Sequence, residues 1–204
     1  MGFFYSRQKS MLVAFIGSHG TGKTMTCSAL HKRLGKHWSV FENVYRRHSR
    51  LLKYKSPGEV INEDPNRRIT VTAMTGSALG ALQDWNQNLK HHGLIDLGPP
   101  SILAYHRYWM KICDTPVSPY LLKLCRYISD QVDLYVYLPT ATVSLVGDKV
   151  EDNRCSDDPI FQKDIDQWVQ GNLIELNIPT HKIFIPNEET IEGRVKEIFQ
   201  QITL

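Results

Sequence analysis

The sequence predicts a three-layer α/β fold with a mainly parallel, five-stranded sheet. Short apolar runs alternate with longer amphipathic segments along the 204 residues, a pattern typical of parallel strands that are connected by helices. The first run, residues 11–16, is apolar at every position, as expected of a strand that is covered on both faces. The other four strands are expected at residues 38–44, 94–97, 132–138 and 182–185.

Helices are expected between these strands. One should begin at Lys23 and end near Gly35, because glycine is common just after a helix C-terminus. The segment 45–66 is polar and basic, and no regular element is predicted there. The remaining helices are expected at about residues 65–92, 102–113, 119–129, 160–176 and 188–202.

Length and composition favour one globular domain. A chain of 204 residues can bury one substantial core, and 42% hydrophobic with 22% charged residues is ordinary for a soluble protein. We expect an N-terminal extension at residues 1–10 and one domain at residues 11–204, with a polar loop at about residues 140–159. The formal net charge of +3 is too small to require a polyanionic partner.

Cysteine usage and hydropathy indicate a cytoplasmic protein without membrane contact. The four cysteines form no C-x-x-C pair and no zinc-like spacing, which favours reduced thiols in a cytosolic protein. The apolar run at residues 11–17 is far too short to cross a bilayer. No obligate protein partner is evident from the sequence.

The strongest motif follows the first expected strand directly. Residues 17–24 read Gly-Ser-His-Gly-Thr-Gly-Lys-Thr and open the first expected helix, which is the pattern of a Walker A phosphate-binding loop. Its glycines let backbone amides point at phosphate oxygens, and the helix N-terminus favours an anion. Lys23 is expected to reach the β- and γ-phosphates, and the Thr24 hydroxyl to ligate Mg²⁺. The candidates for nucleotide binding in this phosphate loop are Gly17, His19, Gly20, Thr21, Gly22, Lys23 and Thr24.

The motif therefore predicts a P-loop NTPase fold and Mg²⁺-dependent chemistry on a nucleotide. Asp96 ends the third expected strand, at the rim where phosphates would lie. It could hold Mg²⁺ through water, accept a proton from an attacking hydroxyl, or be a turn aspartate. Arg154, in the polar loop, is a candidate to approach the transferring phosphoryl group, where negative charge accumulates, although most loop cations are merely solvated.

A basic stretch follows the second expected strand. Six of the ten residues at positions 46–55 are Lys, Arg or His, with Tyr45 before them and Tyr54 among them. Cations interleaved with aromatic rings suit contact with a nucleic-acid backbone and an occasional stacked base. A solvated helix face explains the same pattern equally well.

From about residue 11 to its C-terminus the chain resembles P-loop small-molecule kinases related to ribosylnicotinamide kinase, within the nucleoside and nucleotide kinase superfamily. The resemblance rests on residues 14–24, on residues 96–105, and on Arg154 followed by residues 157–161. It implies ATP as the phosphoryl donor, Asp96 as the acceptor-side base or a metal-shell carboxylate, and Arg154 in a lid over the phosphates. It also implies that Glu42 lies near the acceptor, with Arg46 close behind.

The chain departs from this family at the acceptor side. Relatives commonly read Asp-Arg-Ser-Pro where this chain has Asp-Leu-Gly-Pro at residues 96–99, and Ser101 stands where a second aspartate is frequent. The absent arginine would help to orient the acceptor, and Arg46, Arg47 and Arg50 are candidates to replace it.

The expected activity is an ATP- and Mg²⁺-dependent kinase. Its acceptor would be a hydroxyl of a nucleoside, a nucleotide or a modified pyrimidine in DNA, such as the 5-hydroxymethyluracil that phage kinases of this group phosphorylate. The rival interpretation is a nucleotide-hydrolysing switch or a nucleic-acid-binding ATPase. Against a guanine-nucleotide switch, the sequence contains no Asn-Lys-x-Asp motif.

Overall fold

The computed structural model describes residues 10–43, 45, 66–112, 114–140 and 159–203, and it confirms the predicted sheet. Its five strands have the order β2-β3-β1-β4-β5, and every neighbouring pair is parallel. All strands therefore end at the same edge of the sheet. The strands are β1 (Leu12–Ile16), β2 (Trp38–Phe41), β3 (His92–Ile95), β4 (Leu134–Tyr137) and β5 (Ile183–Phe184).

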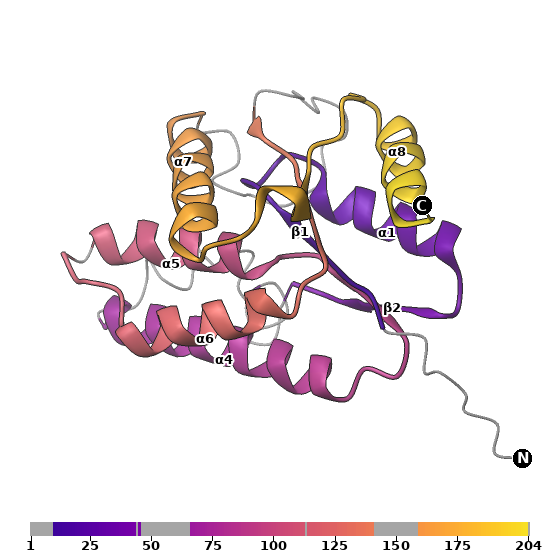
Figure 1. Cartoon of the computed structure of the whole chain (residues 1–204). Helices are drawn as coiled ribbons and strands as arrows, with labels where there is room; N and C mark the ends of the chain where they lie inside the picture. Colours follow the sequence, from indigo (N-terminus) through magenta and orange to yellow (C-terminus); the bar gives the residue numbers. More distant parts are fainter. Residues whose placement is uncertain (1–9, 44, 46–65, 113, 141–158, 204) are drawn as a thin grey trace, which may run out of the picture.

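Helices cover both faces of the sheet, which gives the three layers expected (Figure 1). One face carries α1 (Lys23–Leu34) and α8 (Ile191–Thr203), which lie against each other. The other face carries the remaining long helices of the described part of the chain. These are α4 (Arg67–Gln87), α5 (Pro99–Ile112), α6 (Pro119–Asp130) and α7 (Pro159–Glu175), and a short 3₁₀ helix, η3 (Thr180–Lys182), precedes β5.

Strand β1 explains why its sequence is apolar throughout. Ala14 and Ile16 pack with the layer of α4 to α7, whereas Val13 and Phe15 pack with α1 and α8. All four side chains have no exposed surface. A strand between two helical layers has no solvent face, so the alternation of an amphipathic strand is absent.

Several element boundaries differ from the sequence-based expectation. Strand β2 ends at Phe41 rather than at residue 44, and β3 ends at Ile95, so Asp96 follows the strand instead of lying within it. Helix α5 begins at Pro99, three residues earlier than expected. Proline lacks an amide proton and has a helical φ, so it breaks a strand but fits the first turn of a helix, whose amides have no partner within the helix.

None of the helices in the described ranges is both long enough and apolar enough to cross a membrane. Cys27 and Cys125 are buried free thiols, and Cys113 and Cys155 lie outside the described residues.

Candidate active site

The phosphate loop, residues 17–24, connects the end of β1 to the start of α1. Gly22 is the N-cap of α1 and has φ 83°, a left-handed conformation that suits glycine because other residues would be strained there. At Gly17, with φ 130°, a Cβ atom would lie 2.2 Å from the Leu138 carbonyl oxygen. Gly22 is thus required for the conformation of the loop, and Gly17 is required for the close approach of the loop to the residue after β4.

Lys23 folds back over its own loop. Its ammonium donates a hydrogen bond to the Ser18 carbonyl, and its Nζ lies 3.5 Å from Thr21 Oγ1. The Thr21 hydroxyl donates to the same Ser18 carbonyl at 2.8 Å. The side chain of Lys23 is buried, so the loop holds a desolvated positive charge beside its backbone amides. Such an arrangement favours an anionic ligand.

Asp96 lies beside the phosphate loop because β3 pairs directly with β1, with Ile95 opposite Ala14. The Thr24 hydroxyl donates a hydrogen bond to Asp96 Oδ2 at 3.0 Å. Asp96 is buried, and its backbone amide donates to the Phe41 carbonyl at 3.1 Å. A hydroxyl and a carboxylate side by side are oxygen ligands, which Mg²⁺ prefers.

Ser101, on the first turn of α5, supports the loop from the other side. Its Oγ accepts a hydrogen bond of 2.9 Å from the Gly17 amide and lies 3.3 Å from the Gly17 carbonyl oxygen. Ser101 has no exposed surface. In the sequence this position is a departure from the family pattern, and its role is not evident there. In the structure Ser101 holds the backbone of the phosphate loop at Gly17.

Arg194 is a residue of this region that the sequence analysis missed. It lies on α8, is 1% exposed, and donates from Nη1 to the Thr21 carbonyl at 2.8 Å. Its Nε also donates to the Glu188 carbonyl at 3.0 Å. The sequence separation of 173 residues between Arg194 and Thr21 explains why no local motif contains it.

His19 ties the phosphate loop to α5 and α7. Its Nδ1 lies 3.4 Å from the Tyr105 hydroxyl, within hydrogen-bond distance, and its ring centroid lies 4.7 Å from that of Phe161. Tyr108 packs edge-on against the same Phe161 ring at 4.3 Å. The loop is therefore flanked by aromatic rings on the side of the sheet that carries α5.

A buried hydrogen-bond network lies farther along α4 and α5. The Thr75 hydroxyl donates to the Val71 carbonyl at 2.8 Å, and its Oγ1 is 3.0 Å from both Tyr45 Oη and His106 Nδ1. Because a hydroxyl has one proton, Tyr45 and His106 must both donate to Thr75. His106 then carries its proton on Nδ1, and its buried Nε2 has no hydrogen-bond partner. Burial lowers the pKa of His106 to about 4 from its ordinary 6.5.

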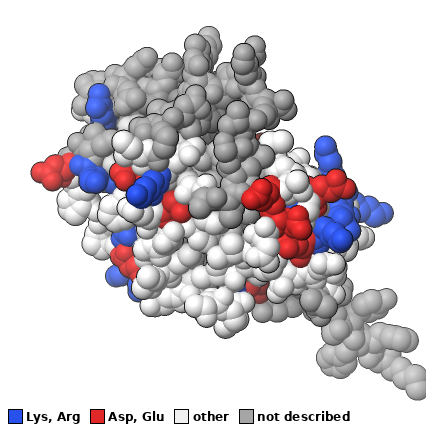
Figure 2. Space-filling model, turned by 90° about the horizontal axis from the view of Figure 1, so that it is seen from above, with Lys and Arg blue, Asp and Glu red and all other residues white. Residues whose placement is uncertain are grey.

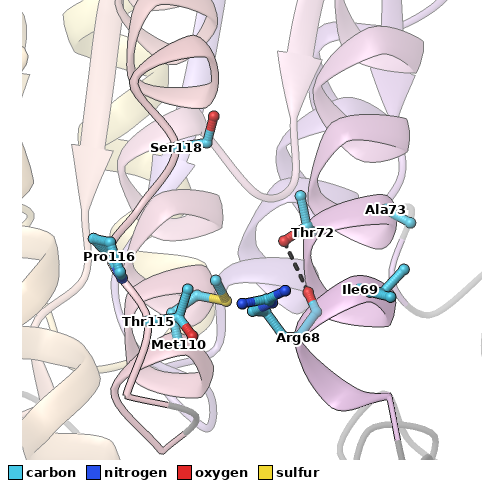
Figure 3. Close-up of a pocket in the computed structure, with 8 residues that line it drawn as sticks. All are labelled: Arg68, Ile69, Thr72, Ala73, Met110, Thr115, Pro116 and Ser118. Carbon is cyan, nitrogen blue, oxygen red and sulfur yellow. Dashed lines mark hydrogen bonds between the residues drawn. The ribbon is translucent and has the colours of Figure 1, made fainter.

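A surface pocket of about 440 Å³ opens at the far end of the same helices (Figure 3). The Arg68 side chain points from α4 toward Met110 across the pocket. Met110 lies nine residues after Ser101, or roughly 14 Å along a helix axis, so this pocket is separate from the phosphate loop. The lining residues are Arg68, Ile69, Thr72, Ala73, Met110, Thr115, Pro116 and Ser118.

The structure thus brings together Lys23, Thr24 and Asp96, three of the residues expected to carry chemistry. Glu42 follows β2 at the same edge of the sheet and is exposed. Arg46, Arg47, Arg50 and Arg154 lie outside the described residues.

A five-stranded parallel sheet with a phosphate-binding loop after β1 and a carboxylate after the adjacent strand defines a P-loop NTPase fold. The family model described as an AAA domain matches residues 12–190, and the chain belongs to this family. No curated protein matches the sequence.

Solved structures of P-loop kinases share the fold. NadR in complex with NAD and AMP-PNP matches with a TM-score of 0.61 and 15% identity over 96% of this chain, which spans only 50% of the NadR chain. Deoxyadenosine kinase from M. mycoides with bound dATP matches with a TM-score of 0.63 and 14% identity, over 95% of this chain and 100% of that one. Thymidylate kinase from Ehrlichia chaffeensis matches with a TM-score of 0.57 and 15% identity, over 95% and 98% of the two chains. The resemblance to nucleoside and nucleotide kinases is thereby confirmed for the fold.

Proposed function

We propose that this protein is an ATP- and Mg²⁺-dependent kinase that transfers the γ-phosphoryl group to a hydroxyl of a nucleoside, a nucleotide or a related base. The observation that carries the proposal is the 3.0 Å hydrogen bond from Thr24 to Asp96. It joins the last residue of the phosphate loop to the carboxylate that directly follows the neighbouring strand β3. The kinases among the similar structures, one with bound dATP, support the same class of activity.

Each residue of the site has a distinct task in this reaction. The acceptor oxygen bonds to the γ-phosphorus while the bond from that phosphorus to the β–γ bridging oxygen breaks, so ADP leaves with added negative charge. Lys23 is placed to neutralise this charge once a nucleotide replaces its bond to Ser18. Thr24 and Asp96 would hold Mg²⁺, which would neutralise negative charge on the phosphates during transfer.

The position of Asp96 favours the metal shell over the role of general base. Its Oδ2 already accepts the Thr24 hydroxyl, and Thr24 is the expected metal-ligating hydroxyl of the loop. Asp96 would therefore reach the metal directly or through one water. The acceptor proton would then be lost to water or to the phosphate. Arg154 belongs to the expected polar loop at about residues 140–159. On the basis of the family resemblance, we propose that its side chain approaches the phosphoryl group.

We propose that the acceptor molecule carries phosphate. If the acceptor is a polymer, it would be DNA that contains a modified pyrimidine. Leu97, which is buried, follows Asp96 where relatives carry an arginine. Arg67 and Arg68 are exposed in the first turn of α4 and follow the cationic stretch of residues 46–55 in the sequence, after a segment without Lys or Arg. In the view from above, the described basic side chains are interspersed with acidic ones (Figure 2), so a polyanion would depend on the 46–55 stretch together with Arg67 and Arg68.

An acceptor screen tests this function. Radiolabelled ATP and Mg²⁺ would be supplied with nucleosides, nucleotides, and duplex or single-stranded DNA that contains 5-hydroxymethyluracil. Label transfer by the wild-type protein and its loss in Lys23→Ala is the expected result. The matched control is Lys32→Ala, at an exposed position of α1. Hydrolysis of ATP without transfer to any acceptor would contradict the kinase proposal and favour a nucleotide-hydrolysing switch.

A further inference from the structure

Arg194 connects three separate segments of the chain. It lies on α8, its Nη1 donates to the Thr21 carbonyl of the phosphate loop at 2.8 Å, and its Nε donates to the Glu188 carbonyl between β5 and α8 at 3.0 Å. Helix α8 lies against α1, the helix that the loop opens (Figure 1). The guanidinium therefore joins the phosphate loop to the last strand–helix connection.

The bond to Thr21 determines the orientation of one peptide group of the phosphate loop. In a planar trans peptide the carbonyl and the amide N–H point in opposite directions. Because the Thr21 carbonyl points at Arg194, the Gly22 amide points to the opposite side. Gly22 has φ 83°, and a glycine at this position can accommodate a rotation of the peptide. The hydrogen bond from Arg194 selects the orientation in which the carbonyl faces α8.

The charge of Arg194 has no carboxylate beside it. Both of its acceptors are backbone carbonyls, and within the described part of the chain no ion pair includes it. Burial lowers the pKa of Arg194 from its ordinary value, and Glu189 raises it by longer-range attraction. A guanidinium nevertheless stays protonated in proteins. A buried cation without an adjacent anion is costly, and a polyphosphate on the loop would supply the opposite charge.

We propose that Arg194 is a positioning residue for the nucleotide phosphates. It holds the Thr21 carbonyl on the side of the loop that faces α8, so that the Gly22 amide is presented to the phosphates, and its charge adds to the attraction for them. This inference rests on the nucleotide site of the proposed function and does not depend on the identity of the acceptor.

The test compares nucleotide binding in three variants. Arg194→Met removes both donors and the charge, whereas Arg194→Lys keeps the charge but cannot reproduce the two-pronged geometry of a guanidinium. Lys196→Met is the matched control, because Lys196 is an exposed cation two residues along the same helix. The probe is Mg²⁺–AMP-PNP, measured by isothermal titration calorimetry, with the thermal shift that the nucleotide produces as a second readout.

We expect Arg194→Met to raise the Kd roughly tenfold or more, because one oriented hydrogen bond to a charged group is worth about that factor. Arg194→Lys should lie between this variant and the wild type, and Lys196→Met should bind as the wild type does. The nucleotide-induced thermal shift should decrease in the same order. A merely structural role would lower the melting temperature of the free protein without changing the Kd.

Three outcomes would overturn the inference. An Arg194→Met protein that binds AMP-PNP as tightly as Lys196→Met shows that Arg194 only supports the fold. If Arg194→Met does not fold, Arg194→Lys decides the question, and wild-type affinity in that variant rejects the inference. Absence of AMP-PNP binding by the wild-type protein rejects both this inference and the proposed function. Binding without phosphoryl transfer contradicts the kinase proposal alone.

Discussion

The Thr24 hydroxyl donates a hydrogen bond of 3.0 Å to Asp96, although 72 residues separate them in the sequence. The contact exists because β3 is the direct neighbour of β1 in the sheet. The residue after β3 therefore lies beside the loop after β1. Mutations at the phosphate loop and at Asp96 should consequently affect the same nucleotide.

Replacement of Lys23 by alanine should slow phosphoryl transfer by about two to three orders of magnitude. The ammonium is expected to balance charge on the bridging and γ-phosphate oxygens, and loss of one such donor costs roughly 3–4 kcal/mol, or on the order of 10²–10³ in rate. The measurement is steady-state transfer with the best acceptor from the screen, with circular dichroism to verify folding. A folded variant with near-normal turnover would refute the assignment of Lys23.

Asp96→Asn should slow transfer and weaken the binding of Mg²⁺–ATP while leaving metal-free ATP binding nearly unchanged. Asparagine preserves the shape of the side chain and an acceptor for the Thr24 hydroxyl, but it lacks the negative charge that Mg²⁺ requires. Titration of ATP with and without Mg²⁺ checks this, with exposed Asp84→Asn as the control. If the rate falls about 10²–10⁴-fold with normal Mg²⁺–ATP affinity, Asp96 acts as the base instead.

Ser101→Ala should destabilise the fold and weaken nucleotide binding. It removes the acceptor of the Gly17 amide, and an unsatisfied buried donor costs about 1–3 kcal/mol. The free energy of unfolding in urea measures the first effect and AMP-PNP titration the second. Ser77→Ala, at an exposed position of α4, is the control and should change neither. Equal stability of the two variants would show that the Gly17 amide finds another partner.

Stability should decrease as the pH falls from 6.5 toward 4. The pKa of His106 is about 4 in the folded protein, against 6.5 ordinarily, so between these values the unfolded chain binds a proton that the folded chain does not. A shift of this size corresponds to about 3 kcal/mol. Chemical denaturation across this pH range measures the decrease in the free energy of unfolding. The variant His106→Asn retains a donor for Thr75 but cannot bind the proton, so the decrease should be smaller in this variant. The exposed His91→Asn should leave it unchanged, and an identical pH dependence in His106→Asn would contradict the prediction.

A polymeric acceptor should bind with a strong dependence on salt. If a nucleic-acid backbone lies against residues 46–55, the log–log slope should be about −0.7 to −0.9 per phosphate contact. Charge reversal at Arg47 and Arg50 should weaken DNA binding and spare AMP-PNP binding, because the phosphate loop is a separate site. Salt-insensitive phosphorylation of a free nucleoside, with no activity on DNA or RNA, would reject the polymeric acceptor.

The sequence predicted the type of every described strand and long helix, because apolar runs and helical periodicity are local properties. Boundaries were less accurate. The strand expected at residues 38–44 ends at Phe41, and the helix expected from residue 102 begins at Pro99. Strand β2 ends where its partner β3 ends, with Phe41 opposite Ile95, and this pairing is not part of the local pattern. Proline fits both the end of a strand and the first turn of a helix, so the local pattern placed the start of α5 too late.

The phosphate loop was determined by the sequence itself, because its spacing of glycines, lysine and threonine is a local requirement for surrounding a phosphate with backbone amides. The supporting residues were decided by the tertiary structure. Ser101 and Arg194 contact the loop from 84 and 173 residues away, and no spacing rule connects them to it. The parallel strand order and the packing of α8 against α1 bring them there, since both depend on how two helical layers cover one sheet.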